Sequence, residues 1–548
     1  MAAFTTTYHY DNGDEFPVEW ADTQIAAQAF WWNAQHTPFA CTPLSTDYLA
    51  NVWAQSGPRD FVHFSGGEAI DTIVHPDGYM YIPIRPPTPP VSVGPDIQAI
   101  RDRFVSQASR IQQTLEEEYR PLMVASCHEF KKSDFSAMTL PAMAARLSEL
   151  LEAAADSFNL TMMSAGPMMI THLPLIAFCN TEFDEEPGSL AEVLEGGFAN
   201  PTTSAHLQLW KLAQLARTDS AVMKFIEADG GNDVNTALAA LPKSTPFAKG
   251  LTKYLAEYGS RAEVWFELST PIAEGNPQSV LEDIGRMISS DESDPRLATA
   301  RSARARRSKT RVIRKRLEKQ PDKLAEFDRL LEVARQYVPV KESRAYWQMT
   351  ITGSFLAPCL AAGRLLADHG VLESEQDVFF LHFDEIDQIA ADPDPKRWKE
   401  LVATRRTKHA VQMATNPPAF IGGKYEATAN IASDGPAVLT KGEVLKGLSA
   451  SAGIVEGRAI VVKTLSEAGK LETGDILICN STSPSWSLLF SRISAVVTTG
   501  GGPLSHTAIV AREYKIPCVL NVEGVTSRVQ DGMQIRVDGT KGTVELVP

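Results

Sequence analysis

The feature that most constrains the fold lies near the C-terminus, where a short apolar run meets three glycines and then a helical pattern. The run SAVVTT (494–499) has the composition of a buried strand, and GGG (500–502) has the composition of a tight turn. From residue 504 to about 515 the apolar spacing becomes that of a helix. We therefore expect a strand, a glycine turn and a helix in succession, with His506 in the first turn of the helix.

Other short β-type runs surround this unit and are separated by glycine turns. They are GIVEGRAIVV, GDILIC, CVLNV, MQIRVDG and GTVELV. Strands of this length with one clear helix between them predict a compact α/β domain over residues 444–548.

The whole chain has 548 residues, more than one hydrophobic core usually serves, so we expect several domains. Residue composition and the spacing of apolar residues divide the part before residue 444 into three segments. Residues 1–95 mix short apolar runs with Pro and Gly, which predicts a small strand-containing region. Residues 96–415 space their apolar residues by three and four, which predicts a helical domain. Residues 416–443, with paired prolines and paired glycines, predict a linker that reaches on the order of 25 to 30 Å as a flexible coil.

Composition excludes several classes of protein. A net charge of −15 disfavours nucleic acid and anionic membranes as partners, since binding them needs a basic face. No apolar run approaches the ~18 residues of a membrane span, and the N-terminus shows no secretory signal, so we expect a cytoplasmic protein. The six cysteines stand singly with no C-x-x-C, so we expect reduced thiols, no metal site and no disulfide framework.

The surroundings expected for His506 suit phosphate chemistry. Backbone N–H groups of Gly501 and Gly502 and the free N–H groups of a helix N-terminus would attract an anion. Ser505 and Thr507 add hydroxyls that could cap the helix or bind phosphate oxygens. The positive end of the helix disfavours imidazolium, so His506 would stay neutral and nucleophilic and could take up a phosphoryl group.

Residues 445–548 resemble the mobile, swivelling phosphohistidine domain of the phosphoenolpyruvate-utilising enzymes. The likeness rests on GLSASAGIVEGRAIVV, on GDILIC, on TSPSWSLLFSRISAVVTTGGGPLSHTAIVAREYKIPCV and on DGMQIRVDGTKGTVEL. In that family the histidine of a GG-x-x-S/C-H motif carries the phosphoryl group, and here that position is His506. The resemblance implies a helical acceptor-binding domain, with a small strand-containing N-terminal region, followed by a swivelling α/β phosphohistidine domain.

The family loads its histidine with an ATP-grasp domain, and the sequence shows neither that domain's motif nor a G-x-x-x-x-G-K-[ST] loop. We therefore expect an ATP-grasp partner subunit that binds ATP and Mg²⁺. This split arrangement resembles phenylphosphate synthase and its relatives that phosphorylate alkylphenols such as p-cresol, which implies a small aromatic hydroxyl substrate. Transfer to an antibiotic hydroxyl or to pyruvate, and a non-catalytic phosphocarrier, stay open as alternatives.

Candidate acceptor-site residues lie in the first half of the chain. YLAEYGSRAEVWFEL resembles a Tyr-Gly-His-Arg-x-x-x-Glu pattern of rifampin phosphotransferases, with Ser260 in place of the histidine. There Arg261 and Glu263 could be a phosphate donor and a base, or a structural ion pair. His172, after four nearby methionines, and His36 are further candidates, although a packed core histidine at His172 and a loop histidine at His36 are the more usual interpretations.

One basic run stands out against the acidic total. Residues 296–319 hold eleven Lys or Arg and a single Glu. Such a run is usually a solvated helix face. A docking surface for the nucleotide-binding partner is the functional alternative.

Overall fold

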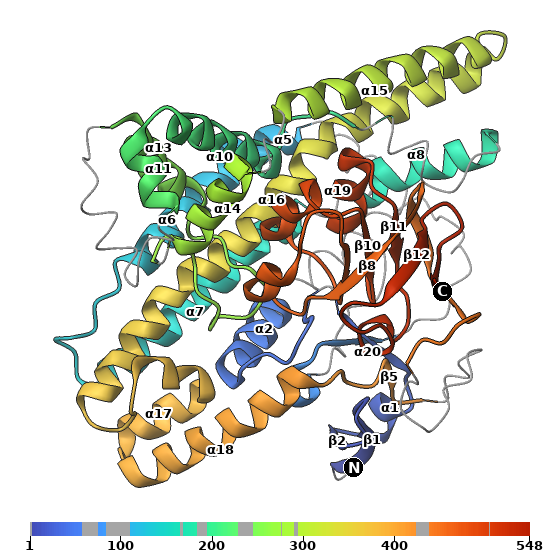
Figure 1. The fold of residues 1–548 in the computed structure, drawn as a ribbon. Coiled ribbons are helices and arrows are strands. Elements are labelled where there is room, and N and C mark those ends of the chain that lie inside the picture. The colour runs from blue at the N-terminus through green and yellow to red at the C-terminus, as the bar shows by residue number, and fades with distance from the viewer. Residues whose placement is uncertain are drawn as a thin grey trace.

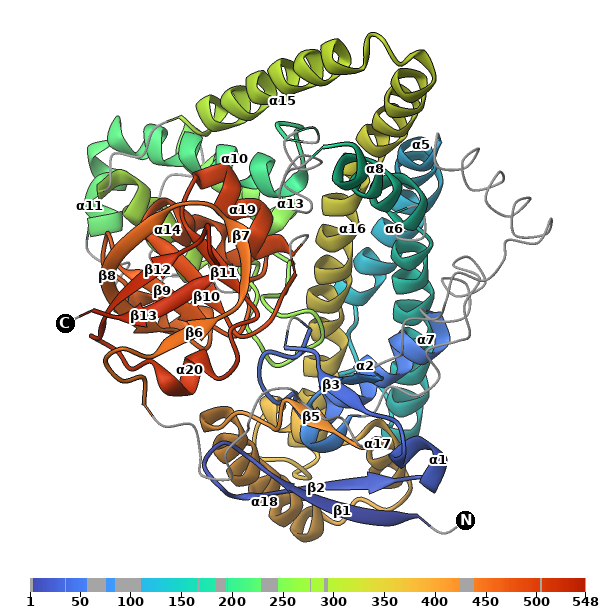
Figure 2. The same cartoon turned by 90° about the vertical axis from the view of Figure 1, so that its right-hand side faces the viewer.

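The computed structural model describes residues 3–34, 36–56, 75–83, 110–164, 168–183, 194, 196–227, 245–275, 277–289, 294–423, 438–502 and 505–547 (Figure 1). A body of helices, here called the helical domain (110–414), is traversed by one long helix, α16. The C-terminal domain (438–547) lies against one side of this body, and the N-terminal strands lie at its base (Figure 2).

The helices begin where the sequence supplies caps and prolines. Thr139, Asn200, Thr245, Asp294 and Asp394 each precede a helix, and each side chain accepts a hydrogen bond from a backbone N–H in the first turn. In all five helices a proline occupies one of the first two positions, where its missing N–H costs nothing. These local signals fix helix starts independently of tertiary packing.

Helix α16 (Pro321–Asp368) is 48 residues long, so it spans about 70 Å. Along its length it contacts α6, α7, α8 and α10 and contributes to two hydrophobic clusters. The other helices of the domain are α5 (Ile111–Thr114), η2 (Leu115–Tyr119), α6 (Arg120–Lys131), α7 (Leu140–Met163), α8 (Met168–Glu182), α10 (Pro201–Arg217), α11 (Ser220–Glu227), α13 (Pro246–Tyr258), α14 (Gln278–Ser289), α15 (Pro295–Leu317), η3 (Glu375–Phe380), α17 (Phe383–Ala391) and α18 (Pro395–Ala414).

By length and composition α16 is also apolar enough to cross a bilayer. However, 78% of its most apolar window is buried inside the protein. That burial is the packing of a core helix.

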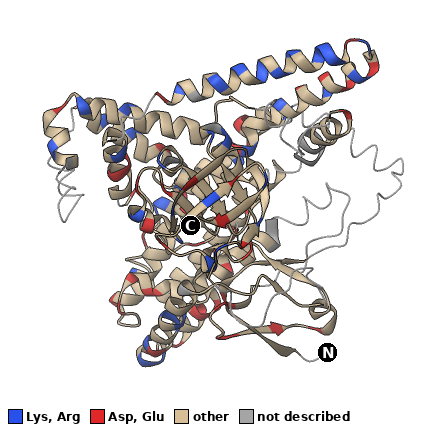
Figure 3. Ribbon diagram, turned by 45° about the vertical axis from the view of Figure 1, so that its right-hand side comes forward, with Lys and Arg blue, Asp and Glu red and all other residues tan. Residues whose placement is uncertain are grey.

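Helices α15 and α16 form a hairpin that projects from the body, and Lys and Arg gather along α15 (Figure 3). Arg301, Arg304, Arg307 and Arg311 are exposed at helical spacing and so share one face. The basic run of the sequence is therefore a solvent-facing helix, and its use as a docking surface stays a prediction.

The N-terminal region forms two small sheets, and one of them includes a strand from residues 420–421. Strands β1 (Phe4–His9) and β2 (Glu15–Trp20) make a hairpin, followed by α1 (Thr23–Ala26). Strand β3 (Phe30–Trp32) lies between β4 (Tyr81–Pro83) and β5 (Phe420–Ile421). The first residues of the segment predicted as a linker thus belong to this sheet, while residues 424–437 of that segment lie outside the described part of the chain.

The C-terminal domain is built on an eight-stranded sheet with the order β6-β13-β12-β8-β9-β10-β11-β7. Strands β8 to β11 run parallel to one another, and the remaining pairs are antiparallel. The strands are β6 (Val444–Lys446), β7 (Leu448–Ser451), β8 (Ile454–Val461), β9 (Ile476–Cys479), β10 (Ala495–Thr498), β11 (Cys518–Leu520), β12 (Gln534–Asp538) and β13 (Thr543–Leu546).

Strand β9 explains why the central runs of this domain are apolar throughout. Leu477 and Cys479 face a cluster that includes η5 (Pro484–Ser491) and α19 (His506–Tyr514). Ile476 and Ile478 face a second cluster, which includes Val525 of α20 (Val525–Arg528). Because both faces of the strand are covered, alternation of polar and apolar residues disappears.

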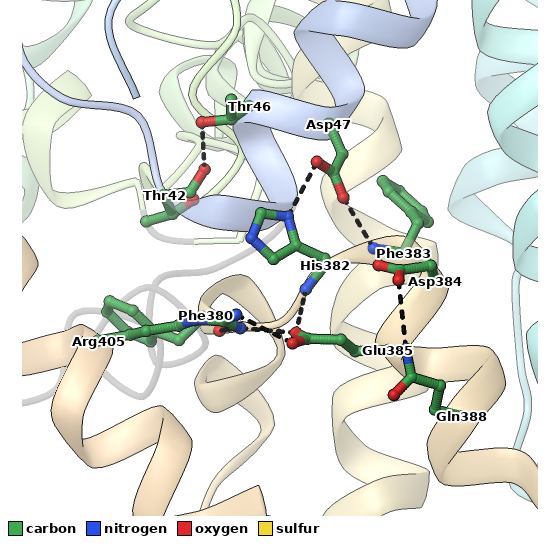
Figure 4. A network of polar contacts seen from close by, with 10 residues as sticks. All are labelled: Thr42, Thr46, Asp47, Phe380, His382, Phe383, Asp384, Glu385, Gln388 and Arg405. Atoms are coloured by element: carbon green, nitrogen blue, oxygen red, sulfur yellow. Dashed lines mark hydrogen bonds and ion pairs between the residues drawn. The ribbon is translucent and has the colours of Figure 1, made fainter. Parts of the chain in front are cut away.

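A polar network joins α2 (Pro43–Ser56) to α17 at the base of the helical domain (Figure 4). Asp47 Oδ1 lies 2.9 Å from His382 Nδ1, and Asp47 Oδ2 accepts a 2.9 Å hydrogen bond from Phe383 N–H. Glu385 accepts from His382 N–H at 2.8 Å and binds Arg405 through both carboxylate oxygens. The Asp47 carboxylate raises the pKa of His382 above its ordinary value.

This raised pKa predicts a pH-dependent contribution to stability. The contribution is fully present below about pH 6.5, the unfolded value, and is lost as pH rises through the folded pKa. The free energy of unfolding lost on His382→Gln should therefore be larger at acidic than at alkaline pH, by at most about 1 kcal/mol because the His382 side chain is 36% exposed. Urea unfolding at several pH values checks this, with exposed His128→Gln as the control. A loss independent of pH would contradict the ion pair.

Candidate functional site

The glycine turn and the start of α19 form the edge of the site in the C-terminal domain. His506 is the first residue of α19, and Ser505 is its N-cap, with Oγ accepting a 3.4 Å hydrogen bond from Ala508 N–H. Gly501 has φ of +107°, a conformation that residues with a Cβ rarely adopt. The glycine turn therefore leads from β10 to the N-terminus of α19, where the helix dipole favours an anion beside His506.

Thr507 lies beside His506 but does not point into the same space. Its hydroxyl lies 2.8 Å from the Thr482 hydroxyl, and both side chains are buried. Thr482 follows β9, and the neighbouring parallel strand β10 leads to the glycine turn, so both loops end at one edge of the sheet. Thr507 thus ties these two loops together in the structure, while a role in binding phosphate stays a prediction.

The other half of the site comes from the helical domain. The His506 side chain is 9% exposed, and its Nδ1 lies 3.9 Å from Oε2 of Glu342, a residue of α16 that is itself buried. Glu342 also accepts a 3.4 Å hydrogen bond from the Thr202 hydroxyl at the start of α10. The histidine of one domain is thus seated against a carboxylate of the other.

This setting keeps the His506 ring neutral. Burial is the largest influence and lowers its pKa to about 4. The Glu342 carboxylate opposes this shift, while the positive charges of Arg261 and Lys341 add to it. The two cations also lie where they would attract a phosphoryl group carried on the ring.

The Glu263 carboxylate binds groups of the C-terminal domain and not the neighbouring Arg261 side chain. Its Oε1 accepts a 2.6 Å hydrogen bond from Leu465 N–H, and its carboxylate accepts a second one from the Trp486 side chain. Burial raises the pKa of Glu263, and these two hydrogen bonds oppose the rise. Glu263 is therefore bound to groups of the C-terminal domain, and the structure does not support the interpretation of Arg261 and Glu263 as a structural ion pair.

A cleft lies where the N-terminal region, the helical domain and the C-terminal domain meet. It is partly open to solvent, and its cavity volume is about 10 Å³, room for about one water molecule. Aromatic and other apolar walls combine in it with a carboxylate, an ammonium group and hydroxyls. Its lining residues are Pro38, Phe39, Glu263, Val264, Trp265, Lys463, Ser481, Ser483 and Trp486.

His36 lies behind this cleft. Its ring packs against Trp265 at 5.4 Å between centroids and against Phe266 at 5.9 Å. Its Nδ1 lies 2.6 Å from the side-chain amide of Asn33, and burial lowers its pKa to about 3. A neutral ring packed in this way supports the Trp265 wall. The side chain of His172, on α8, lies outside the described residues.

Sequence reasoning missed Glu342, Lys341 and Thr482. Glu342 and Lys341 belong to VKESR, and charged residues also recur through the preceding turns of α16. Nothing local therefore distinguishes this run or indicates that it faces His506. Thr482 carries no signal beyond its place after a buried strand.

The two glycines of the turn make a matched pair for testing its geometry. A Cβ on Gly501 would sit 3.2 Å from Ser505 Oγ and would require the left-handed backbone, whereas a Cβ on Gly502 would meet nothing within 4 Å. We expect Gly501→Ala to destabilise the C-terminal domain by about 1–2 kcal/mol, and Gly502→Ala by under ~0.5 kcal/mol. Thermal unfolding of the full chain measures both, and equal losses would contradict the assigned turn.

Comparison with known proteins matches both halves of this site. Residues 471–542, which include His506, match the family model described as PEP-utilising enzyme, mobile domain. Residues 158–342, which include Arg261 and end at Glu342, match the model described as rifampicin phosphotransferase fourth domain. A chain of the crystal structure of Thermococcus kodakaraensis aconitase X aligns over its full length with 20% of this chain at 25% identity, with a TM-score of 0.17 that supports no argument.

Curated relatives agree with the family models. The rifampicin phosphotransferase of Streptomyces sviceus is 30% identical over 64% of this chain, and that of Bacillus subtilis is 27% identical over 63%. The chondramide synthase of Chondromyces crocatus is 28% identical over 70% of this chain, which corresponds to 10% of that protein. The chain spans 40% of the length of each of these two rifampicin phosphotransferases. Its C-terminal part is therefore similar to the mobile domain of the phosphoenolpyruvate-utilising enzymes, and its helical part is similar to the fourth domain of rifampicin phosphotransferases.

Proposed function

We propose that this chain is a phosphotransferase unit in which His506 carries a phosphoryl group and passes it to the hydroxyl of a small aromatic molecule. The observation that carries the proposal is the seat of His506, at a helix N-terminus and 3.9 Å from Glu342 of the other domain. Arg261 and Lys341 act on the same ring through their charges. A histidine placed between an anion-attracting turn and two cations is suited to phosphoryl transfer.

The two ring nitrogens have different roles in this proposal. Nδ1 faces Glu342, so Nε2 is the nitrogen that carries the phosphoryl group. The charge of Glu342 favours a proton on Nδ1. When the P–N bond breaks, its electron pair returns to Nε2 and the ring leaves as neutral imidazole. The acceptor oxygen forms the new P–O bond, and its proton passes to a carboxylate, for which Glu263 in the cleft is our candidate.

The lining of the cleft has the chemistry to bind a planar aromatic acceptor, which would occupy a wider form of the cleft than the one in this structure. Phe39, Trp265 and Trp486 supply flat apolar walls, and Lys463 and two serine hydroxyls supply polar contacts. Phenol or an alkylphenol such as p-cresol fits this chemistry. An antibiotic hydroxyl is the second candidate, because matched relatives are rifampicin phosphotransferases.

A direct test loads His506 chemically with phosphoramidate, follows the phosphohistidine by phosphorus NMR, and then adds phenol, p-cresol or rifampicin. We expect one acceptor to become phosphorylated as the phosphohistidine signal disappears. His506→Asn should abolish the acceptor phosphate and the phosphohistidine resonance of residue 506. Exposed His128→Asn should remove only its own phosphohistidine resonance and leave acceptor phosphorylation unchanged. Acceptor phosphate formed at the normal rate by His506→Asn would refute the proposal. Discharge of His506 only to another protein would indicate a phosphocarrier.

We further propose that an ATP-grasp partner subunit, which binds ATP and Mg²⁺, loads His506 in the cytoplasm. The exposed basic face of α15 is a candidate surface for this partner. Incubation of this chain alone with MgATP should leave His506 unlabelled in mass spectra, while phosphoramidate should label it. Labelling by MgATP without a second protein would overturn the need for a partner.

A further inference from the structure

The helix that begins with His506 ends at a second contact between the two domains. Tyr514, the last residue of α19, places its hydroxyl 2.6 Å from Nδ1 of His206 in α10. The two rings are nearly parallel, at an interplanar angle of 3° with centroids 6.0 Å apart. His206 is buried, so this contact forms well inside the interface between the domains.

The position of Tyr514 on the helix lets this contact influence the orientation of His506. The two residues are eight positions apart, which is about 12 Å along the helix axis. His506 is held at one end of α19 against Glu342 of α16, and Tyr514 at the other end against α10. Two attachments along a rigid helix fix its direction, whereas one would leave it free to pivot.

Tyr514 is also anchored within its own domain. Its ring lies 6.3 Å from that of Phe490 and packs against the cluster formed by η5 and the sheet. The C-terminal domain therefore presents the tyrosine hydroxyl in a fixed orientation. A shift of this domain away from the helical domain would break the contact with His206 while leaving the Phe490 contact in place.

We propose that Tyr514 and His206 are positioning residues that form a latch and hold the C-terminal domain with His506 facing the acceptor side. The latch raises the fraction of molecules in the docked arrangement, in which the two domains pack as they do in this structure. Its consequence for catalysis rests on the proposed function, whereas its effect on docking does not. Removal of the tyrosine hydroxyl should therefore weaken docking without altering the chemistry at His506.

The experiment measures docking directly in the full chain. Nitroxide labels on cysteines introduced at exposed Glu400 and Lys541 report the distance between the domains, and the six native cysteines are buried. Tyr514→Phe should lower the ratio of docked to undocked molecules roughly two- to tenfold, the usual worth of one hydrogen bond. Tyr48→Phe is the matched control. Its hydroxyl lies 3.2 Å from that of Thr352 and so joins α2 to the helical domain, and neither residue belongs to the C-terminal domain, so docking should not change.

A double-mutant cycle separates the latch from general loosening. His206→Phe should reduce docking about as much as Tyr514→Phe, and the double variant should lose little more than either. With phosphohistidine loaded, single-turnover transfer should slow in proportion to the fall in the fraction of docked molecules, which the same distance measurements give. Unchanged distances in Tyr514→Phe, or additive losses in the double variant, would overturn the latch. A changed docked ratio with no transfer in any variant would instead refute the proposed function alone.

Discussion

The burial of one imidazole between two domains is the constraint on which the rest of the site depends. His506 can be reached by Glu342, Arg261 and Lys341 only because the C-terminal domain lies against the helical domain. The same packing removes water from the ring and lowers its pKa to about 4. A catalytic histidine on a single rigid domain would need its partners close by on that domain, whereas here they come from a different part of the chain.

The contacts between the two domains must be strong enough to hold them together and weak enough to let them separate. The described interface uses a few polar contacts, among them those of Glu263 with Leu465 and of Tyr514 with His206. Each such hydrogen bond contributes on the order of 1 kcal/mol, so together they can hold one arrangement without making it permanent. The proposed loading of His506 away from the helical domain would require this balance, because the C-terminal domain would have to leave its contacts with that domain.

The sequence predicts the local parts of this architecture well. Caps and prolines mark helix starts, and the glycine turn between β10 and α19 follows from residue types that few other structures tolerate. Contacts between distant segments could not be predicted, because no periodicity or spacing reports them. Glu342 beside His506, β5 paired with β3, and Glu263 bound to Leu465 N–H all belong to this class. Glu263 shows the difference most clearly, since its chemistry was visible in the sequence and its partner was not.

Docking also adjusts the acid–base properties of both reacting sides at once. Burial is the largest influence on His506 and on Glu263, and it acts in opposite directions because it disfavours the charged form of each. It lowers the pKa of the imidazole and raises that of the carboxylate. In the proposed transfer, the raised pKa would make Glu263 a stronger base toward the hydroxyl of the acceptor, while burial keeps the unloaded His506 ring uncharged. Both pKa values move back toward their ordinary values when water reaches the groups, so these properties depend on the domains being together.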